Sequence, residues 1–167
     1  AGLLLRGAAL VALLYAGTLV VGAAAGHDDP WRPLGRLGAT AAPAASAPAF
    51  LRVRNTDELD AALKAAAARG DRVLLEFYAE WCVSCKTMER RVFTQPAVQA
   101  RLASLTLLKA DITANSAADR ALLTRYTLFG PPALLFFDAA GQEITAARLT
   151  GETDAASLLA HLDRHGL

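Results

Sequence analysis

The strongest constraint on this chain is a pair of cysteines, Cys82 and Cys85, that closely follows an apolar stretch. Residues 73–79 are apolar except for Glu76, a pattern typical of a strand buried on both faces of a sheet. Residues 82–92 follow as a predicted helix. These two are the only cysteines in the chain. A Cys-x-x-Cys pair between a strand and a helix indicates a redox-active dithiol.

The predicted positions of the two sulfur atoms give each a separate role. Cys82 begins the helix, where unpaired N–H groups and the helix dipole stabilise a negative charge and therefore a thiolate. The thiolate is the nucleophile in disulfide exchange. Cys85 lies one turn further on the same face, so it can attack a mixed disulfide and release a reduced partner. We therefore predict a redox-active Cys82–Cys85 disulfide.

Two alternatives to a redox pair are a structural disulfide and half of a zinc site. A disulfide that closes so short a loop stabilises a fold by only roughly 2 kcal/mol on the chain-entropy argument. Zinc prefers four ligands, and the histidines His27, His161 and His165 are distant from the cysteines in sequence. No metal site is therefore expected. His161 and His165 share one face of a terminal helix and are expected to lie in solvent.

Residues 50–167 resemble the C-terminal periplasmic thioredoxin-like domain of the DsbD family of thiol:disulfide interchange proteins. The cysteine motif alone indicates only the wider thioredoxin superfamily. The narrower match depends on the Cys-Val-x-Cys-Lys form and on the Thr-Ala-Asn stretch, and the matching segments are 78–86, 110–115, 130–138 and 150–151. The resemblance implies an α/β thioredoxin-like fold with a central mixed sheet flanked by helices.

The resemblance also implies a protein-disulfide reductase that passes electrons by dithiol–disulfide exchange. The expected donor is a membrane-embedded domain, itself supplied by a cytoplasmic thioredoxin system. The expected acceptors are a periplasmic immunoglobulin-like domain and downstream disulfide proteins. No bound cofactor is expected, because the cysteine pair carries the electrons. The head domain is expected to be monomeric.

The motif alone leaves other functions open. They are a membrane-anchored thioredoxin-like reductase of cytochrome c maturation, a dithiol oxidase, and a non-catalytic adaptor with a structural disulfide. A reduction potential near thioredoxin's, about −270 mV, fits a reductase, and one near about −120 mV fits an oxidase. The net charge of +1 provides no basic patch, so a nucleic-acid partner is not expected.

Two acidic residues are candidates for controlling the protons of the cysteines. Burial of Glu76 in its apolar strand raises a carboxyl pKa, and we expect this group to exchange protons with Cys85. Glu89 follows Cys85 by one helical turn, and its charge disfavours a thiolate, whereas Lys86 and the helix dipole favour one. The resemblance associates acidic residues at both positions with a raised cysteine pKa.

Trp81, Pro131 and Pro132 are the predicted partner-binding residues. By resemblance, Pro132 is a cis-proline beside the sulfur atoms, and the residue before it pairs through its backbone with the partner chain. Pro131 has no N–H, so one docking hydrogen bond, with a net effect of roughly 1 kcal/mol, is expected to be missing. Trp81 is expected to shield the disulfide, with Tyr78 packed beneath it.

The rest of the pattern predicts the element order β-α-β-α-β-α-β-β-α. Asn55 and Glu58 form a predicted capping pair for a helix that ends near Arg69. Thr94 is the predicted cap of a second helical piece with Pro96 in its first turn. The predicted strands are 50–54, 73–79, 105–111, 133–138 and 143–150, and the other predicted helices are 82–92, 117–126 and 154–164.

Residues 1–26 are predicted to be a transmembrane helix that ends a membrane domain. The uncharged stretch 8–26 spans about 28 Å as a helix, close to the roughly 30 Å hydrocarbon core. Arg6 favours a cytoplasmic start, which would place residues 27–167 in the periplasm at the bacterial inner membrane. A signal peptide is the alternative. Residues 27–49, rich in Ala and Pro, are the predicted flexible linker to a domain of residues 50–167.

Overall fold

The computed structural model describes residues 2–24 and 47–167, in a chain that divides into two compact units, 1–44 and 45–167. The first unit contains the helix α1 (Gly2–Ala24). Its stretch Arg6–Ala23 is long and apolar enough to cross a membrane, a test that a signal sequence near the N-terminus also passes. The predicted linker lies outside the described residues except for 47–49.

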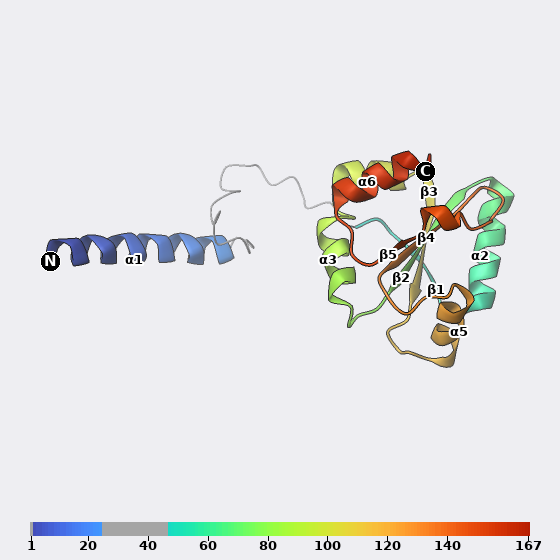
Figure 1. Ribbon diagram of the computed structural model, residues 1–167, viewed down its shortest axis with the longest axis horizontal. Helices are drawn as coiled ribbons and strands as arrows, with labels where there is room; N and C mark the ends of the chain where they lie inside the picture. Colours follow the sequence, from blue (N-terminus) through green and yellow to red (C-terminus); the bar gives the residue numbers. More distant parts are fainter. Residues whose placement is uncertain (1, 25–46) are drawn as a thin grey trace. The chain divides into compact units, whose positions relative to one another are not determined.

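The second unit contains a sheet of five strands: β1 (Leu51–Val53), β2 (Arg72–Tyr78), β3 (Leu105–Asp111), β4 (Ala133–Phe137) and β5 (Leu149–Thr150). Their spatial order is β1-β3-β2-β4-β5, so β2 lies at the centre (Figure 1). β2 pairs in parallel with β3 and antiparallel with β4. β1 extends the parallel half and β5 the antiparallel half.

Five helices cover the two faces of this sheet: α2 (Thr56–Arg69), α3 (Val83–Arg91), α4 (Pro96–Leu102), α5 (Ala117–Arg125) and α6 (Ala155–Arg164). α2 and α5 lie on one face, and α3, α4 and α6 lie on the other (Figure 1). Alternate residues of β2 enter the two cores, because successive side chains of a strand point to opposite faces: Leu75 packs in the α2 core and Leu74 in the α3 core. The predicted α/β fold with a central mixed sheet is confirmed.

Local sequence signals explain where several helices begin and end. The side chain of Asn55 accepts a hydrogen bond from the backbone N–H of Glu58 at 2.8 Å, so the predicted cap of α2 is confirmed. Gly70 ends that helix with φ +73°, a conformation that glycine adopts without steric cost. Asp154 caps α6 in the same way as Asn55 caps α2, through the N–H of Ser157 at 2.8 Å.

One predicted helix cap was wrong, and one predicted strand is only partly confirmed. Thr94 does not cap α4, because its hydroxyl donates to the carbonyl of Arg90 at 2.7 Å, and Gln95 holds the N-cap position without a side-chain hydrogen bond. The predicted strand 143–150 makes one bridge to Phe137 and then forms the 3₁₀ helix η1 (Thr145–Ala147) before β5. Its backbone bonds locally there, as Ala147 donates to Ile144 at 2.8 Å, instead of continuing the ladder with β4.

Candidate active site

The two cysteines form a disulfide at the start of α3, with an S–S distance of 2.01 Å. Cys82 occupies the N-cap position, and its sulfur accepts a hydrogen bond from the backbone N–H of Cys85 at 3.1 Å. That placement stabilises a thiolate at Cys82 once the disulfide is reduced. Cys82 is 6% exposed and Cys85 is fully buried, so an incoming sulfur reaches Cys82 first.

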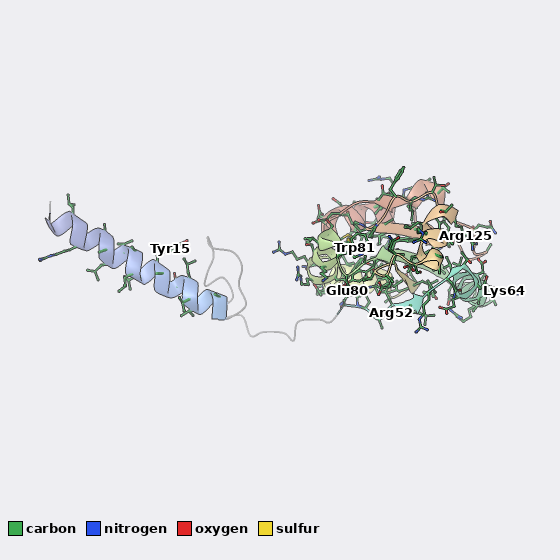
Figure 2. The ribbon with its side chains drawn as sticks, turned by 90° about the horizontal axis from the view of Figure 1, so that it is seen from below. Tyr15, Arg52, Lys64, Glu80, Trp81 and Arg125 are labelled. Carbon is green, nitrogen blue, oxygen red and sulfur yellow. A yellow bond between two sulfur atoms is a disulfide. The ribbon has the colours of Figure 1, made fainter. Side chains whose placement is uncertain are left out.

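A hydrogen-bonded loop positions the residues that precede the disulfide. The hydroxyl of Thr113 accepts a hydrogen bond from the backbone N–H of Glu80 at 2.8 Å and donates to Asp111 at 2.5 Å. The indole N–H of Trp81 donates to the carbonyl of Thr113 at 3.2 Å. Glu80 and Trp81 lie at one end of the domain, and Lys64 of α2 lies at the other (Figure 2). The Thr-Ala-Asn stretch thereby fixes the segment that leads into Cys82.

A pocket of about 580 Å³ lies beside this loop. The peptide bond between Pro131 and Pro132 is cis, as the resemblance implied. Trp81 is 59% exposed on the pocket wall, and the neighbouring Phe129 is fully exposed. The lining residues are Trp81, Thr127, Leu128, Phe129, Gly130, Pro131, Pro132, Arg148, Thr150 and Gly151. All three predicted partner-binding residues therefore line one pocket.

A buried charged cluster lies on the α3 side of the sheet. Glu76 points to this side, because Leu74, two residues earlier, belongs to the same core cluster as Met88 of α3. Glu76 is fully buried, and the ammonium nitrogen of Lys109 lies 3.2 Å from its Oε2. Neither carboxyl oxygen makes a hydrogen bond of good geometry with the described residues. Lys109 also forms an ion pair with Glu89 of α3, one turn beyond Cys85.

The surroundings of Glu76 raise its pKa to about 7. Burial is the largest cause, since it disfavours the charged form, and the nearby Glu89 adds to the rise. The ammonium group of Lys109 opposes both effects. Glu76 therefore changes its protonation state near neutral pH, in the range where a group that exchanges protons with a thiol is most effective.

Two residues of this site, Lys109 and Thr113, were not predicted from the sequence. Lys109 is a charged residue in a strand that is otherwise largely apolar, which is the same signal that drew attention to Glu76. The two residues are register partners in the parallel pairing of β2 and β3. Lys86, which was expected to favour the thiolate, forms an ion pair with Glu80 at 3.1 Å.

The prediction that His161 lies in solvent was wrong. His161 is buried on the sheet side of α6, and its Nε2 lies 2.8 Å from the carbonyl oxygen of Ala147 in η1. The ring of His165 lies 4.5 Å away between centroids and is partly exposed. No group of three or more potential metal ligands occurs within residues 2–24 and 47–167.

The chain is similar to known proteins of thiol–disulfide exchange. A family model described as thioredoxin-like matches residues 54–139. The chain is 51% identical over 152 residues to "Thiol:disulfide interchange protein DsbD 2" of Pseudomonas aeruginosa, which covers 89% of this chain and 26% of that protein. It is 50% identical over 158 residues to DsbD of Ralstonia nicotianae, which covers 92% of this chain and 26% of that protein. The chain thus spans about a quarter of the length of these relatives.

Solved structures of single thioredoxin-like domains also match this chain. The oxidised C-terminal domain of DsbD from Neisseria meningitidis matches with a TM-score of 0.60 and 31% identity, over 70% of this chain and 98% of that chain. A thioredoxin from Thermus thermophilus matches with a TM-score of 0.55 and 28% identity, over 71% of this chain and 89% of that chain.

Proposed function

Because this chain belongs to the DsbD family of thiol:disulfide interchange proteins, within the thioredoxin-like proteins, we propose that residues 47–167 reduce protein disulfides by dithiol–disulfide exchange. The observation that carries the proposal is the position of the Cys82–Cys85 disulfide. Cys82 caps the N-terminus of α3. A partner sulfur can reach the disulfide only at Cys82, because Cys85 is fully buried. A structural staple would need neither property.

In the proposed reaction two electrons pass from the cysteine pair to the partner. The Cys82 thiolate attacks one sulfur of a partner disulfide, that S–S bond breaks, and the partner's other sulfur leaves as a thiolate. The thiol of Cys85 then loses its proton and attacks the sulfur of Cys82. The mixed disulfide breaks, the second partner sulfur leaves as a thiolate, and the Cys82–Cys85 disulfide forms. The partner thiolates take up protons from water.

Glu76 is the group that we assign to receive the proton of Cys85. Its burial on the α3 side of the sheet and its pKa of about 7 support this role. Glu89, one turn beyond Cys85, adds a negative charge that opposes a thiolate in the reduced pair. Both roles concern the reduced chain, in which the two sulfurs titrate.

We assign partner docking to the pocket beside Cys82. Trp81, Pro131 and Pro132 line it, and the exposed ring of Phe129 extends its apolar surface. The pocket accepts a segment of the partner chain next to the scissile disulfide. Because Pro131 offers no N–H, the partner backbone pairs there with one hydrogen bond fewer than a residue with an N–H would provide.

The wider setting is also a proposal, drawn from the family. α1 anchors the chain in the bacterial inner membrane, and the domain works in the periplasm. A membrane-embedded domain, supplied by a cytoplasmic thioredoxin system, reduces the cysteine pair. A periplasmic immunoglobulin-like domain and downstream disulfide proteins accept the electrons. The cysteines themselves carry the electrons, so the exchange needs no bound cofactor.

The reduction potential of the Cys82–Cys85 pair tests this function. The full chain is equilibrated with thiol buffers of known potential, and the oxidised fraction is measured. A value near or somewhat above about −270 mV is expected for a reductant. A value near about −120 mV would instead identify an oxidase. If the cysteine pair exchanges with no thiol, the disulfide is structural and the proposal is overturned.

A further inference from the structure

Among the described residues that line the pocket beside Cys82, Arg148 is the one that carries a charge. Two nitrogens of its guanidinium group, Nε and Nη2, donate to Oε1 of Glu143 at 2.9 and 2.7 Å. Both side chains are largely shielded from solvent, with 25% of Arg148 and 15% of Glu143 exposed. The carboxylate therefore compensates the positive charge of Arg148 and fixes the plane of its guanidinium group.

The third nitrogen of that group holds the end of a helix. Nη1 of Arg148 donates to the carbonyl of Tyr126 at 2.8 Å, and Tyr126 is the C-cap residue of α5. The last carbonyls of a helix have no partner within the helix, so another group must satisfy them. Arg148 does so at the point where the chain leaves α5. The next four residues, 127–130, all line the pocket, and we call them the docking loop.

The docking loop needs such support because of its own conformation. Thr127 has φ +53°, which is uncommon for a β-branched residue. The ring of Phe129 is fully exposed, so it makes no packing contact that could fix the loop. The position of that ring therefore depends on the backbone at the two ends of the loop.

The other end of the loop is held by the same segment that contains Arg148. The carbonyl of Pro132 accepts a hydrogen bond from the backbone N–H of Gly151 at 2.9 Å. Arg148 and Gly151 flank the two-residue strand β5. Residues 148–151 thus hold the chain on both sides of the docking loop, through a side chain at one end and a backbone N–H at the other.

We propose that Arg148 is a positioning residue for partner docking. Its guanidinium group, oriented by Glu143, holds the Tyr126 carbonyl and so fixes the docking loop that presents Phe129 on the pocket. This inference rests on the proposed function and adds to it a residue that acts on partner binding through the loop.

Arg69 provides a matched control for the loss of such a side chain. Like Arg148, it joins a carboxylate to a helix carbonyl, since Nε donates to Asp71 at 2.8 Å and Nη1 to the carbonyl of Ala65 at 3.1 Å. It is the last residue of α2 and precedes β2, whereas Cys82 follows the other end of that strand. Arg69→Met therefore removes the same kind of contacts far from the pocket.

The test is a double-mutant cycle on the full chain, in which KM and kcat are measured for the reduction of insulin with dithiothreitol as electron donor. Arg148→Met is expected to raise KM roughly fivefold and to change kcat less, because Phe129 is no longer held in place. In a chain that already carries Phe129→Ala, it is expected to raise KM by less than about twofold, since no ring is left to position. Arg69→Met is expected to leave KM unchanged in both chains.

Equal effects of Arg148→Met on KM with and without the Phe129 ring would overturn the proposal. Should Arg148→Met fail to fold, Glu143→Gln takes its place in the cycle, because it removes the charge that orients the guanidinium group. The same dependence on the Phe129 ring is expected, and its absence would again overturn the proposal.

A second measurement needs no partner. The backbone N–H of Leu128 donates to the carbonyl of Leu123 at 2.9 Å, so its hydrogen exchange, followed by NMR in the oxidised full chain, reports on the docking loop. In Arg148→Met this exchange is expected to be about tenfold faster relative to that of Leu75 in β2, and in Arg69→Met it is expected to match the native chain. Unchanged exchange in Arg148→Met would overturn the proposal. A failure of the proposed function would instead appear as a native chain that does not reduce insulin.

Discussion

The ammonium nitrogen of Lys109 lies 3.2 Å from Oε2 of Glu76, where the central strand β2 pairs in parallel with β3. Both side chains are almost completely removed from solvent. Burial has the larger effect on the carboxyl, so the pKa of Glu76 rises to about 7 in spite of the cation beside it. This carboxyl therefore links the stability of the domain to pH.

The first prediction concerns the pH dependence of the free energy of unfolding. The Glu76 carboxyl titrates near 4.5 in the unfolded chain and near 7 in the folded one, so the folded state binds the proton more tightly. The resulting stabilisation is complete below the unfolded pKa and is lost as the pH rises through about 7, with a total on the order of 3 kcal/mol. Glu76→Gln is expected to lack this loss. Urea denaturation of the oxidised native and variant chains at about pH 4 and about pH 8 measures the difference. An equal pH dependence in the two chains would contradict it.

The second prediction separates the roles of the two cysteines. Cys85→Ser keeps the attacking thiolate and removes the group that resolves the mixed disulfide, so a covalent complex with a disulfide-containing partner is expected to accumulate. Cys82→Ser leaves the buried Cys85 as the remaining thiol and is expected to form little complex. Non-reducing electrophoresis after incubation with a protein disulfide measures both. Equal trapping by the two variants would contradict the assignment.

The third prediction concerns the exposed ring of Phe129 on the pocket. Phe129→Ala is expected to raise KM for a protein disulfide about tenfold, because an exposed aromatic beside the site supplies docking area. The free energy of unfolding is expected to change by less than about 0.5 kcal/mol. Leu51→Ala is the control, since Leu51 is also exposed but belongs to β1 at the opposite edge of the sheet. An equal effect of the two substitutions on KM would argue against docking at this pocket.

The fourth prediction concerns the missing donor at Pro131. Pro131→Thr supplies a backbone N–H beside the docking pocket and is expected to strengthen partner binding by roughly 1 kcal/mol, about a fivefold lower Kd. Calorimetry of the full chain with a reduced partner domain measures the affinity. An unchanged Kd would show that the partner backbone does not pair at this position.

The fifth prediction concerns the loop before the disulfide. Thr113→Val keeps the shape of the side chain but leaves the N–H of Glu80 and the carboxyl of Asp111 without the Thr113 hydroxyl, at a cost of about 1–3 kcal/mol in the free energy of unfolding. Thr87→Val is the matched control, because the Thr87 hydroxyl bonds within its own helix to the carbonyl of Val83. Denaturant unfolding measures the free energy of unfolding that each variant loses. Equal losses in the two variants would contradict the role assigned to the Thr113 hydroxyl in this loop.

Features set by local chain chemistry were predicted well from the sequence. The Asn55 cap, the end of α2 near Arg69 and the strand 105–111 depend on residues close together in the chain, and the structure confirms each. The disulfide and its place at the start of α3 follow from a spacing of three residues. Thr94 shows the limit of such reasoning, since its hydroxyl found a nearer acceptor in the preceding helix.

The position of His161 and the structure of residues 143–150 were predicted wrongly from the sequence, for different reasons. His161 was expected in solvent, but α6 packs on the sheet, and the carbonyl of Ala147 gives its ring a buried acceptor. Residues 143–150 were predicted to be a strand, but the local 3₁₀ helix η1 replaces most of their pairing with β4. The burial of His161 depends on a contact between segments that are distant in the chain, so it cannot be read from neighbouring residues.

The sequence by itself determined that this chain presents two cysteines at the start of a helix, because caps, turns and apolar periodicity act over a few residues. It also marked Glu76 as a carboxyl in an apolar strand. The tertiary structure alone decided what that carboxyl meets. The parallel register of β2 and β3 places Lys109 against it, and the packing of α3 brings Glu89 to the same ammonium group. Electrostatic interactions in a buried site depend on separations of a few ångströms between groups that are far apart in the chain, so only the folded arrangement sets them.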